Sequence, residues 1–187
     1  PGAGRLACGD VGEGKLANVQ DIFDAIMALL YEKKDYAGKK ALVTAGGTEA
    51  PLDPVRVLTN RSSGKMGIAL AKALRNRGAE VTLVHGHLQV GLPEGVRTVE
   101  ALTNEAMKNA VEDVYEEMDY VFMAAAVSDY KVKSVATEKI KKDGDTYQLE
   151  LVKDVDILQG LGEKKSHQVL IGFAAESSDL EKRAEEK

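Results

Sequence analysis

The chain of 187 residues has one cysteine and three histidines, and it lacks any long apolar run. A lone cysteine, Cys8, cannot form an intramolecular disulfide, so we expect a reducing compartment, by default the cytoplasm. The longest apolar stretch, residues 120–127, is far too short to cross a bilayer, and the N-terminus lacks a signal-peptide pattern. We therefore expect no membrane partner. The histidines have no metal-ligand spacing, so no histidine or cysteine metal site is expected; they are His85, His87 and His167.

A strong excess of one charge sign is also missing, since the net charge is −5 at pH 7. A general nucleic-acid-binding protein would have a basic face, so we expect no nucleic-acid partner. A local group of lysines can still bind an anionic substrate. The 44% apolar and 29% charged residues are typical of a soluble globular protein, and the length allows one domain with a core.

From residue 39 onward, short apolar segments alternate with helical patterns. This predicts an α/β, Rossmann-like three-layer fold, with a mainly parallel sheet and helices on both faces. Expected central strands are residues 41–45, 80–85, 119–127 and 169–174, an edge strand is 146–152, and expected helices are 64–75, 104–117, 154–161 and 178–187. Ligands bind such sheets outside the carboxyl ends of the strands, which here lead into residues 46–63, 86–90, 128–142 and 176 onward.

The N-terminal part has a different pattern. Residues 1–17 are rich in glycine and are expected to form a loop or tail. Asn18 is expected to cap a linker helix over residues 19–34, within a linker of residues 18–38. At the other end, the chain stops inside a charged helical pattern, and we expect the domain to be cut short there.

Helical spacing also predicts which side chains face the core. The first helix of the alternating part should place Met66, Leu70 and Leu74 on one stripe. The next should turn inward Ala106, Ala110, Val111 and Val114.

Residues 44–67 form an unusually long connection between a strand and a helix, and such connections are usually functional. At Gly46 and Gly47 the backbone can approach a ligand closely, and Ser62–Gly64 open a helix whose free N–H groups suit an anion. Neither the P-loop pattern nor the dinucleotide fingerprint is present. Phosphate binding and ordinary turn and cap chemistry are therefore equally supported.

Three further candidates each have two interpretations. Asn60 is either a turn residue or a neutral donor that stabilises developing negative charge. Asp129 either solvates a strand end or binds a nucleotide or metal ion. The lysines of the segment EKIKK form a solvated face or neutralise a polyphosphate; they are Lys139, Lys141 and Lys142.

Four motifs together resemble one enzyme family. AGGTEAPLDPVRVLTNRSSGKMG, AAAVSDY, EKIKK and GFAAES occur in the order and spacing of phosphopantothenoylcysteine synthetase. This is the phosphopantothenate–cysteine ligase half of bacterial bifunctional coenzyme A enzymes, the Dfp flavoprotein type. The resemblance covers residues 39–187, which are expected to be the ligase domain. GRLACGDVGEGKLA resembles the last loop of the upstream decarboxylase domain, where Cys8 would be the catalytic acid.

The resemblance implies an enzyme that uses CTP and Mg²⁺. The carboxylate of 4′-phosphopantothenate would attack the α-phosphate of CTP, and cysteine would then displace CMP from the acyl-cytidylate. A homodimer formed through the ligase domain is implied as well. FMN would belong only to the absent upstream decarboxylase domain, so Cys8 is expected to be a remnant without decarboxylase activity or bound FMN.

Carried over residue by residue, the resemblance implies that Asn60 and Lys139 are catalytic and that Lys139 also contacts CTP. The other implied nucleotide-binding residues are Gly46, Gly47, Ser62, Ser63, Gly64, Gly67, Met123, Ala124, Ala125, Asp129, Asp154, Val155, Asp156, Ile157, Phe173 and Lys187. No metal ligand is assigned. Where the family usually has Asn-Pro-Asp-Ile, this chain has Asp154 and Val155 before Asp156 and Ile157.

Two other function classes are compatible with a nucleotide-binding α/β fold. A non-catalytic nucleotide-binding module or regulatory subunit is the alternative. A nicotinamide dehydrogenase is disfavoured, because the glycine fingerprint is absent and the second strand ends in His85-Gly86-His87 without an acidic ribose partner.

Overall fold

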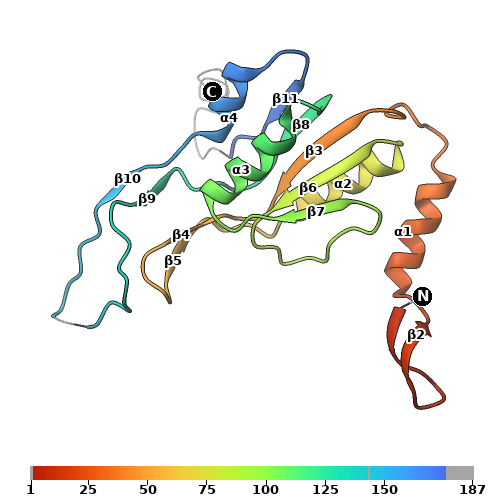
Figure 1. Ribbon diagram of the computed structural model, residues 1–187, viewed down its shortest axis with the longest axis horizontal. Helices are drawn as coiled ribbons and strands as arrows, with labels where there is room; N and C mark the ends of the chain where they lie inside the picture. The colour runs from red at the N-terminus through yellow and green to blue at the C-terminus, as the bar shows by residue number, and fades with distance from the viewer. Residues whose placement is uncertain (1, 143, 176–187) are drawn as a thin grey trace.

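The computed structural model describes residues 2–142 and 144–175. At its centre is a five-stranded sheet with strand order β11-β8-β3-β6-β7 (Figure 1). The strands are β3 (Lys40–Ala45), β6 (Glu80–His85), β7 (Arg97–Glu100), β8 (Tyr120–Met123) and β11 (Val169–Gly172). Each neighbouring pair is parallel, which confirms the predicted α/β fold.

The core lies on both faces of β3, whose residues Ala41, Leu42 and Val43 are fully buried. A strand buried on both faces needs a continuous apolar run, as this one has. Helix α2 (Lys65–Asn76) packs on one face through Ile68, Ala71 and Leu74. Helices α3 (Asn104–Tyr115) and α4 (Ile157–Lys164) pack on the other face, where Met107, Val111 and Leu161 join Leu42. The prediction of helices on both faces is confirmed.

Two small antiparallel sheets extend from the central sheet (Figure 1). One pairs β4 (Glu49–Pro51) with β5 (Val57–Thr59), inside the long connection that follows β3. The other pairs β9 (Tyr130–Val132) with β10 (Leu151–Lys153) and forms an arm. The long connection is therefore a folded hairpin and not an open loop.

The predicted strand positions were wrong in two places. The expected edge strand over 146–152 is reduced to β10, which pairs with β9 in the arm and not with the central sheet. In the described part of the chain, β11 lies at the edge of the sheet and not at its centre. Alternation of apolar residues does not say which partner a strand will find, and the short polar β7 has no alternation to detect.

The N-terminal prediction was also wrong. Gly2–Arg5 (β1) and Val11–Lys15 (β2) form an antiparallel hairpin. Glycine-rich strands pair through their backbones without side-chain alternation, so the pattern was hidden. Helix α1 (Val19–Leu30) ends four residues before the expected end at 34; Asn18 does cap it, accepting a hydrogen bond from the Gln20 N–H at 2.9 Å.

The buried faces of α2 and α3 differ from the predicted stripes. Of the predicted stripe on α2, Leu74 is buried and Leu70 packs against the core, but Met66 is 51% exposed, and the small residues Gly67 and Ala71 are also buried. Small side chains let the helix approach β3 closely, whereas the prediction followed the largest apolar residues. In α3 the buried residues are Asn104, Met107, Val111 and Tyr115; the expected Ala106, Ala110 and Val114 lie partly buried at the margin. The expected helix over 178–187 lies outside the described residues.

Candidate active site

The segments that follow β3, β6 and β8 are hydrogen-bonded to one another beyond the strand ends. The Gly47 N–H donates to the His87 carbonyl at 3.2 Å, and the His87 N–H donates back to the Gly47 carbonyl at 2.9 Å. On the other side, the Ala126 N–H donates to the Gly46 carbonyl at 2.8 Å. The carboxyl edge of the sheet is therefore a connected platform, at the place where α/β folds bind ligands.

The glycines of this platform serve close packing. Gly46 has φ +80°, and a Cβ there would overlap the His87 carbonyl; Gly64 has φ +75°, and a Cβ would overlap the Leu88 side chain. Gly67 faces β3, where a Cβ would lie 2.5 Å from the Ala45 Cβ. The sequence predicted that the backbone at Gly46 and Gly47 approaches a ligand closely. In the structure, the backbone there approaches the neighbouring protein segment at His87.

Asn60 lies just after β5, beside a cleft of about 400 Å³. The cleft is lined by Gly47, Thr59, Asn60, Arg61, Ser62, His87 and Gln89. The Asn60 Nδ2 donates to the Val127 carbonyl at 2.9 Å, which fixes the amide group. A primary amide carries two N–H donors, so one remains for a ligand. The Thr59 hydroxyl donates to the Thr48 carbonyl at 2.7 Å and secures the backbone next to Asn60.

Ser62, three residues before the first residue of α2, lines the same cleft. The Gly64 N–H lies 3.3 Å from the Ser62 Oγ, and the Lys65 N–H lies 3.5 Å from the Ser63 Oγ. These are long contacts, so the first N–H groups of the helix are weakly held. Such groups, together with the helix dipole, favour a bound anion. Ser62 and Asn60, two positions apart in the chain, both line this cleft.

A histidine–glutamate pair borders the cleft and was not predicted. The His87 Nε2 lies 2.7 Å from the Glu49 Oε2, which joins the segment after β6 to β4. The two residues are 38 positions apart, and no sequence pattern marks the pair. A carboxylate at this distance orients the imidazole ring.

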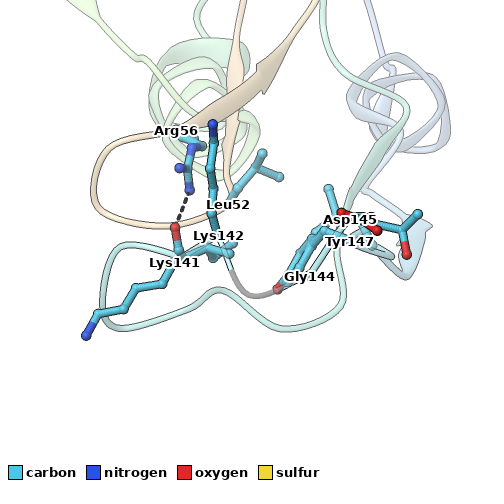
Figure 2. Close-up of a pocket in the computed structure, with 10 residues that line it drawn as sticks. Leu52, Arg56, Lys141, Lys142, Gly144, Asp145 and Tyr147 are labelled. Carbon is cyan, nitrogen blue, oxygen red and sulfur yellow. Dashed lines mark hydrogen bonds between the residues drawn. The ribbon is translucent and has the colours of Figure 1, made fainter.

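The lysine-rich segment is fastened to the β4–β5 hairpin through Asp53, which is 3% exposed. Its carboxylate accepts hydrogen bonds from the Val55 and Arg56 N–H groups, each at 2.8 Å, and from the Ile140 N–H at 3.0 Å. The Arg56 guanidinium binds the same carboxylate at 2.6 Å and donates to the Ile140 carbonyl at 3.0 Å, the dashed line in Figure 2. Burial alone would raise the pKa of Asp53, but these donors outweigh it and lower the pKa to about 2.

Lys139 therefore precedes an anchored residue. A hollow of about 530 Å³ lies between the Leu52–Arg56 turn and residues 140–149, and Lys141 extends away from Arg56 beside it (Figure 2). Asn60 does not line this larger hollow. Because Asn60 and Ser62 both line the smaller cleft, that cleft is the candidate active site.

The predicted nucleotide-binding residues after β8 lie next to those before α4. Met123 ends β8 and Ala124 and Ala125 follow it; the Ala125 N–H donates to the Thr44 hydroxyl at 3.1 Å. The Asp154 N–H donates to the Asp129 carbonyl at 2.9 Å, which joins the two segments. Asp156 caps α4 by accepting from the Gln159 N–H at 2.9 Å.

The remaining predicted residues are more dispersed. Val155 is 38% exposed and Ile157 is buried in the core. Phe173 follows β11 and is 42% exposed. Cys8 is an exposed free thiol in the turn between β1 and β2. Lys187 lies outside the described residues.

A second feature missed by sequence reasoning is Asn104, the first residue of α3, which is 3% exposed. Its side-chain amide forms hydrogen bonds with the Thr48 hydroxyl, the Ser128 carbonyl and the Asp154 carboxylate. Asparagine at a helix start is common, so the sequence carried no signal for this role.

Over residues 2–142 and 144–175, no group of three or more His, Cys, Asp or Glu side chains could hold a metal ion. In the same ranges, no helix is long and apolar enough to cross a membrane.

Comparison with known proteins identifies the family. Residues 36–187 match the DNA/pantothenate metabolism flavoprotein C-terminal domain. The chain belongs to this family.

Similar proteins agree with the assignment to the flavoprotein C-terminal domain family. The chain is 42% identical over 190 residues to the coenzyme A biosynthesis bifunctional protein CoaBC of Bacillus subtilis, and 38% identical over 188 residues to that of Haemophilus influenzae. Each match covers 100% of this chain and 47% of the relative, so the chain spans about half the length of these curated relatives.

Solved structures show the same fold. A crystal structure of the C-terminal domain of a CoaBC protein matches with a TM-score of 0.71 and 44% identity, covering 80% of this chain and 71% of that one. A Cab2 mutant in complex with phosphopantothenate-cysteine matches with a TM-score of 0.53 at 19% identity, covering 89% of this chain and 74% of that one, which supports the fold alone.

Proposed function

We propose that this chain catalyses the CTP-dependent ligation of 4′-phosphopantothenate with cysteine in coenzyme A biosynthesis. The products would be 4′-phosphopantothenoylcysteine, CMP and pyrophosphate. Family membership and relatives named for coenzyme A biosynthesis support this class of reaction. The observation that carries the proposal is the shared cleft of Asn60 and Ser62 at the carboxyl edge of the sheet.

The first step joins the substrate carboxylate to the nucleotide. A carboxylate oxygen attacks the α-phosphorus of CTP, and the bond to pyrophosphate breaks, so negative charge must be neutralised at the phosphates. Lys139 supplies positive charge from a segment that Asp53 holds in place through Ile140. The N–H groups at Ser63–Lys65 supply a second electropositive end.

The second step forms the amide. The amine nitrogen of cysteine attacks the acyl carbon, the carbon–oxygen bond to CMP breaks, and the nitrogen loses a proton to solvent. The free N–H of the Asn60 amide is suited to donate to the acyl oxygen as charge develops there, because its other N–H is held by Val127. A neutral donor does this without changing its own charge.

Magnesium fits this proposal only as an ion that binds together with the triphosphate of CTP. Across the described ranges no carboxylate cluster forms a cage for it, whereas Mg²⁺ commonly retains water and binds substrate phosphates. When bound, the ion would neutralise phosphate charge. Asp129, which is exposed and accepts a hydrogen bond from the Asp154 N–H through its carbonyl, is one predicted carboxylate that could contact the ion.

The wider assembly also belongs to this proposal. We expect a cytoplasmic homodimer formed through residues 39–187, and an upstream flavin-dependent decarboxylase in proteins of the relatives' length. The β1–β2 hairpin with Cys8 would belong to that decarboxylase. By itself, this chain is expected to bind no FMN and to carry out no decarboxylation.

Pyrophosphate release from CTP tests the proposal. It would be measured with 4′-phosphopantothenate, with and without cysteine, using this chain and a chimera completed with the remaining segments of the Bacillus subtilis relative. We expect release without cysteine and amide product only with it. A protein that binds CTP but consumes none in either form would contradict the ligase and support the non-catalytic alternative.

A further inference from the structure

Four polar residues meet beneath the platform, each from a different segment; Thr48, Asn104 and Asp154 take part through their side chains and Ser128 through its backbone N–H and carbonyl. They are Thr48 (0% exposed), Asn104 (3%), Ser128 (6%) and Asp154, whose side chain is 8% exposed. Buried polar groups are costly unless they are hydrogen-bonded. Every member of this cluster has a hydrogen-bond partner within it, so the burial of these polar groups is compensated.

Asn104 is the centre of the cluster. Its Oδ1 accepts from the Thr48 hydroxyl at 2.5 Å, and its Nδ2 donates to the Ser128 carbonyl at 2.6 Å and to the Asp154 Oδ2 at 2.8 Å. Both amide hydrogens and the oxygen are thus used. The helix itself does not need this side chain, because Thr103 caps α3 by accepting from the Ala106 N–H at 3.2 Å.

Asp154 is held from three sides. Its carboxylate accepts from Asn104, from the Lys131 ammonium at 2.9 Å and from the Val155 N–H at 2.9 Å. Burial would raise the pKa of Asp154, but Lys131 and these donors outweigh it, and the pKa is lowered. The carboxylate is therefore ionised at neutral pH and retains its partners.

The same cluster reaches the catalytic segment. The Thr48 carbonyl accepts the Thr59 hydroxyl, one residue before Asn60, and the Asn60 amide donates to Val127, one residue before Ser128. Hydrogen bonds, joined by the Thr59–Asn60 and Val127–Ser128 backbone links, thus connect Asn60 with Asp154. Val155 follows Asp154 without the fixed φ that a proline would impose, so side-chain contacts must hold this turn.

We propose that Asn104 is a positioning residue that acts through Asp154, holding the 154–157 turn in register with Asn60 so that the nucleotide and the acyl group meet. The proposal rests on the proposed ligase function. Lys131 is the second support of the same turn. Neither residue touches the reacting atoms in this role.

Steady-state kinetics of the completed chimera test the inference. Asn104→Ala and Lys131→Met should each raise the KM for CTP by about tenfold or more, because each removes a hydrogen-bond partner from the buried Asp154 carboxylate. The KM for 4′-phosphopantothenate should change far less. Matched controls are Asn109→Ala on the same helix and Lys133→Met, whose exposed pair with Glu150 lies on the same arm; both should leave the KM for CTP unchanged.

A double-mutant cycle decides whether Asn104 acts through Asp154. Asn104→Ala should add little to the KM of Asp154→Ala, since coupled residues are not additive. The inference would be overturned if the two substitutions raised the KM for CTP by factors that multiply in the double mutant. It would also be overturned if Asn104→Ala raised the KM values for CTP and 4′-phosphopantothenate equally, or left the KM for CTP unchanged. None of these outcomes would contradict the ligase proposal. Absence of CTP consumption by the unsubstituted protein would overturn the ligase proposal and this inference with it.

Discussion

The Asp53 carboxylate accepts a hydrogen bond from the Ile140 N–H at 3.0 Å, across 87 residues of sequence. This contact joins the β4–β5 hairpin, which leads to Asn60, to the segment that carries Lys139. The two residues predicted to be catalytic are therefore attached to segments that Asp53 holds together.

Asp53 should make stability depend on pH. Its pKa is lowered to about 2 in the folded chain from an ordinary value of 3.8, so its contribution is present above about pH 4 and is lost as the pH falls through about 2. Asp53→Asn should lower the free energy of unfolding in urea at pH 7, and the difference from the unsubstituted chain should shrink in acid. Asp113→Asn, on the exposed side of α3, is the control. A difference that stays constant down to pH 2 would contradict this account.

Asn60→Asp should separate the two half-reactions. The substitution removes both N–H donors of the side chain, including the one to the Val127 carbonyl, and adds a charge, so amide formation should slow by about 100-fold, as on loss of other donors to a developing oxyanion. Formation of the acyl-cytidylate, followed by pyrophosphate release without cysteine, should slow much less. Asn109→Asp serves as the control. An equal loss in both steps would show that Asn60 has another role.

Lys139→Gln should act on the first half-reaction instead. Removing a charge that neutralises the triphosphate should slow pyrophosphate release by about 10- to 100-fold. Lys133→Gln, which also removes one positive charge, should have little effect because its partner Glu150 is exposed on the arm. If both substitutions slow pyrophosphate release equally, Lys139 acts only through the net charge of the protein and not through a contact with the triphosphate.

Gly67→Ala and Gly160→Ala should change stability in opposite directions. A Cβ at Gly67 would lie 2.5 Å from the Ala45 Cβ and 2.8 Å from the Thr44 carbonyl, and such overpacking costs about 1–3 kcal/mol. Gly160 lies in α4 with nothing within 4 Å of an added Cβ, so alanine should stabilise that helix by about 0.5–1 kcal/mol. Thermal unfolding of both variants measures this, and stabilisation by Gly67→Ala would disprove the close approach of α2 to β3.

The sequence predicted what depends on local patterns. The apolar runs of β3 and β6 and the motif around Asn60 could be recognised without tertiary information. The partner of β10 and the edge position of β11 could not, because strand pairing is decided between distant segments.

Within the site, the same limit applies. Ser62 and Asn60 are neighbours in sequence and were predicted together. The pairs His87–Glu49 and Asn104–Asp154 join residues that are 38 and 50 positions apart. The spacing of apolar residues along the sequence does not predict contacts over such distances.

The double attachment of Gly46 and Gly47 has a mechanical consequence. Because these residues bond to His87 on one side and to Ala126 on the other, the inner segments at the carboxyl edge cannot shift one at a time. A displacement that starts at any of the three strand ends is carried to the other two. We therefore expect the inner part of the site to move as one unit, whereas the β4–β5 hairpin and the β9–β10 arm can adjust separately.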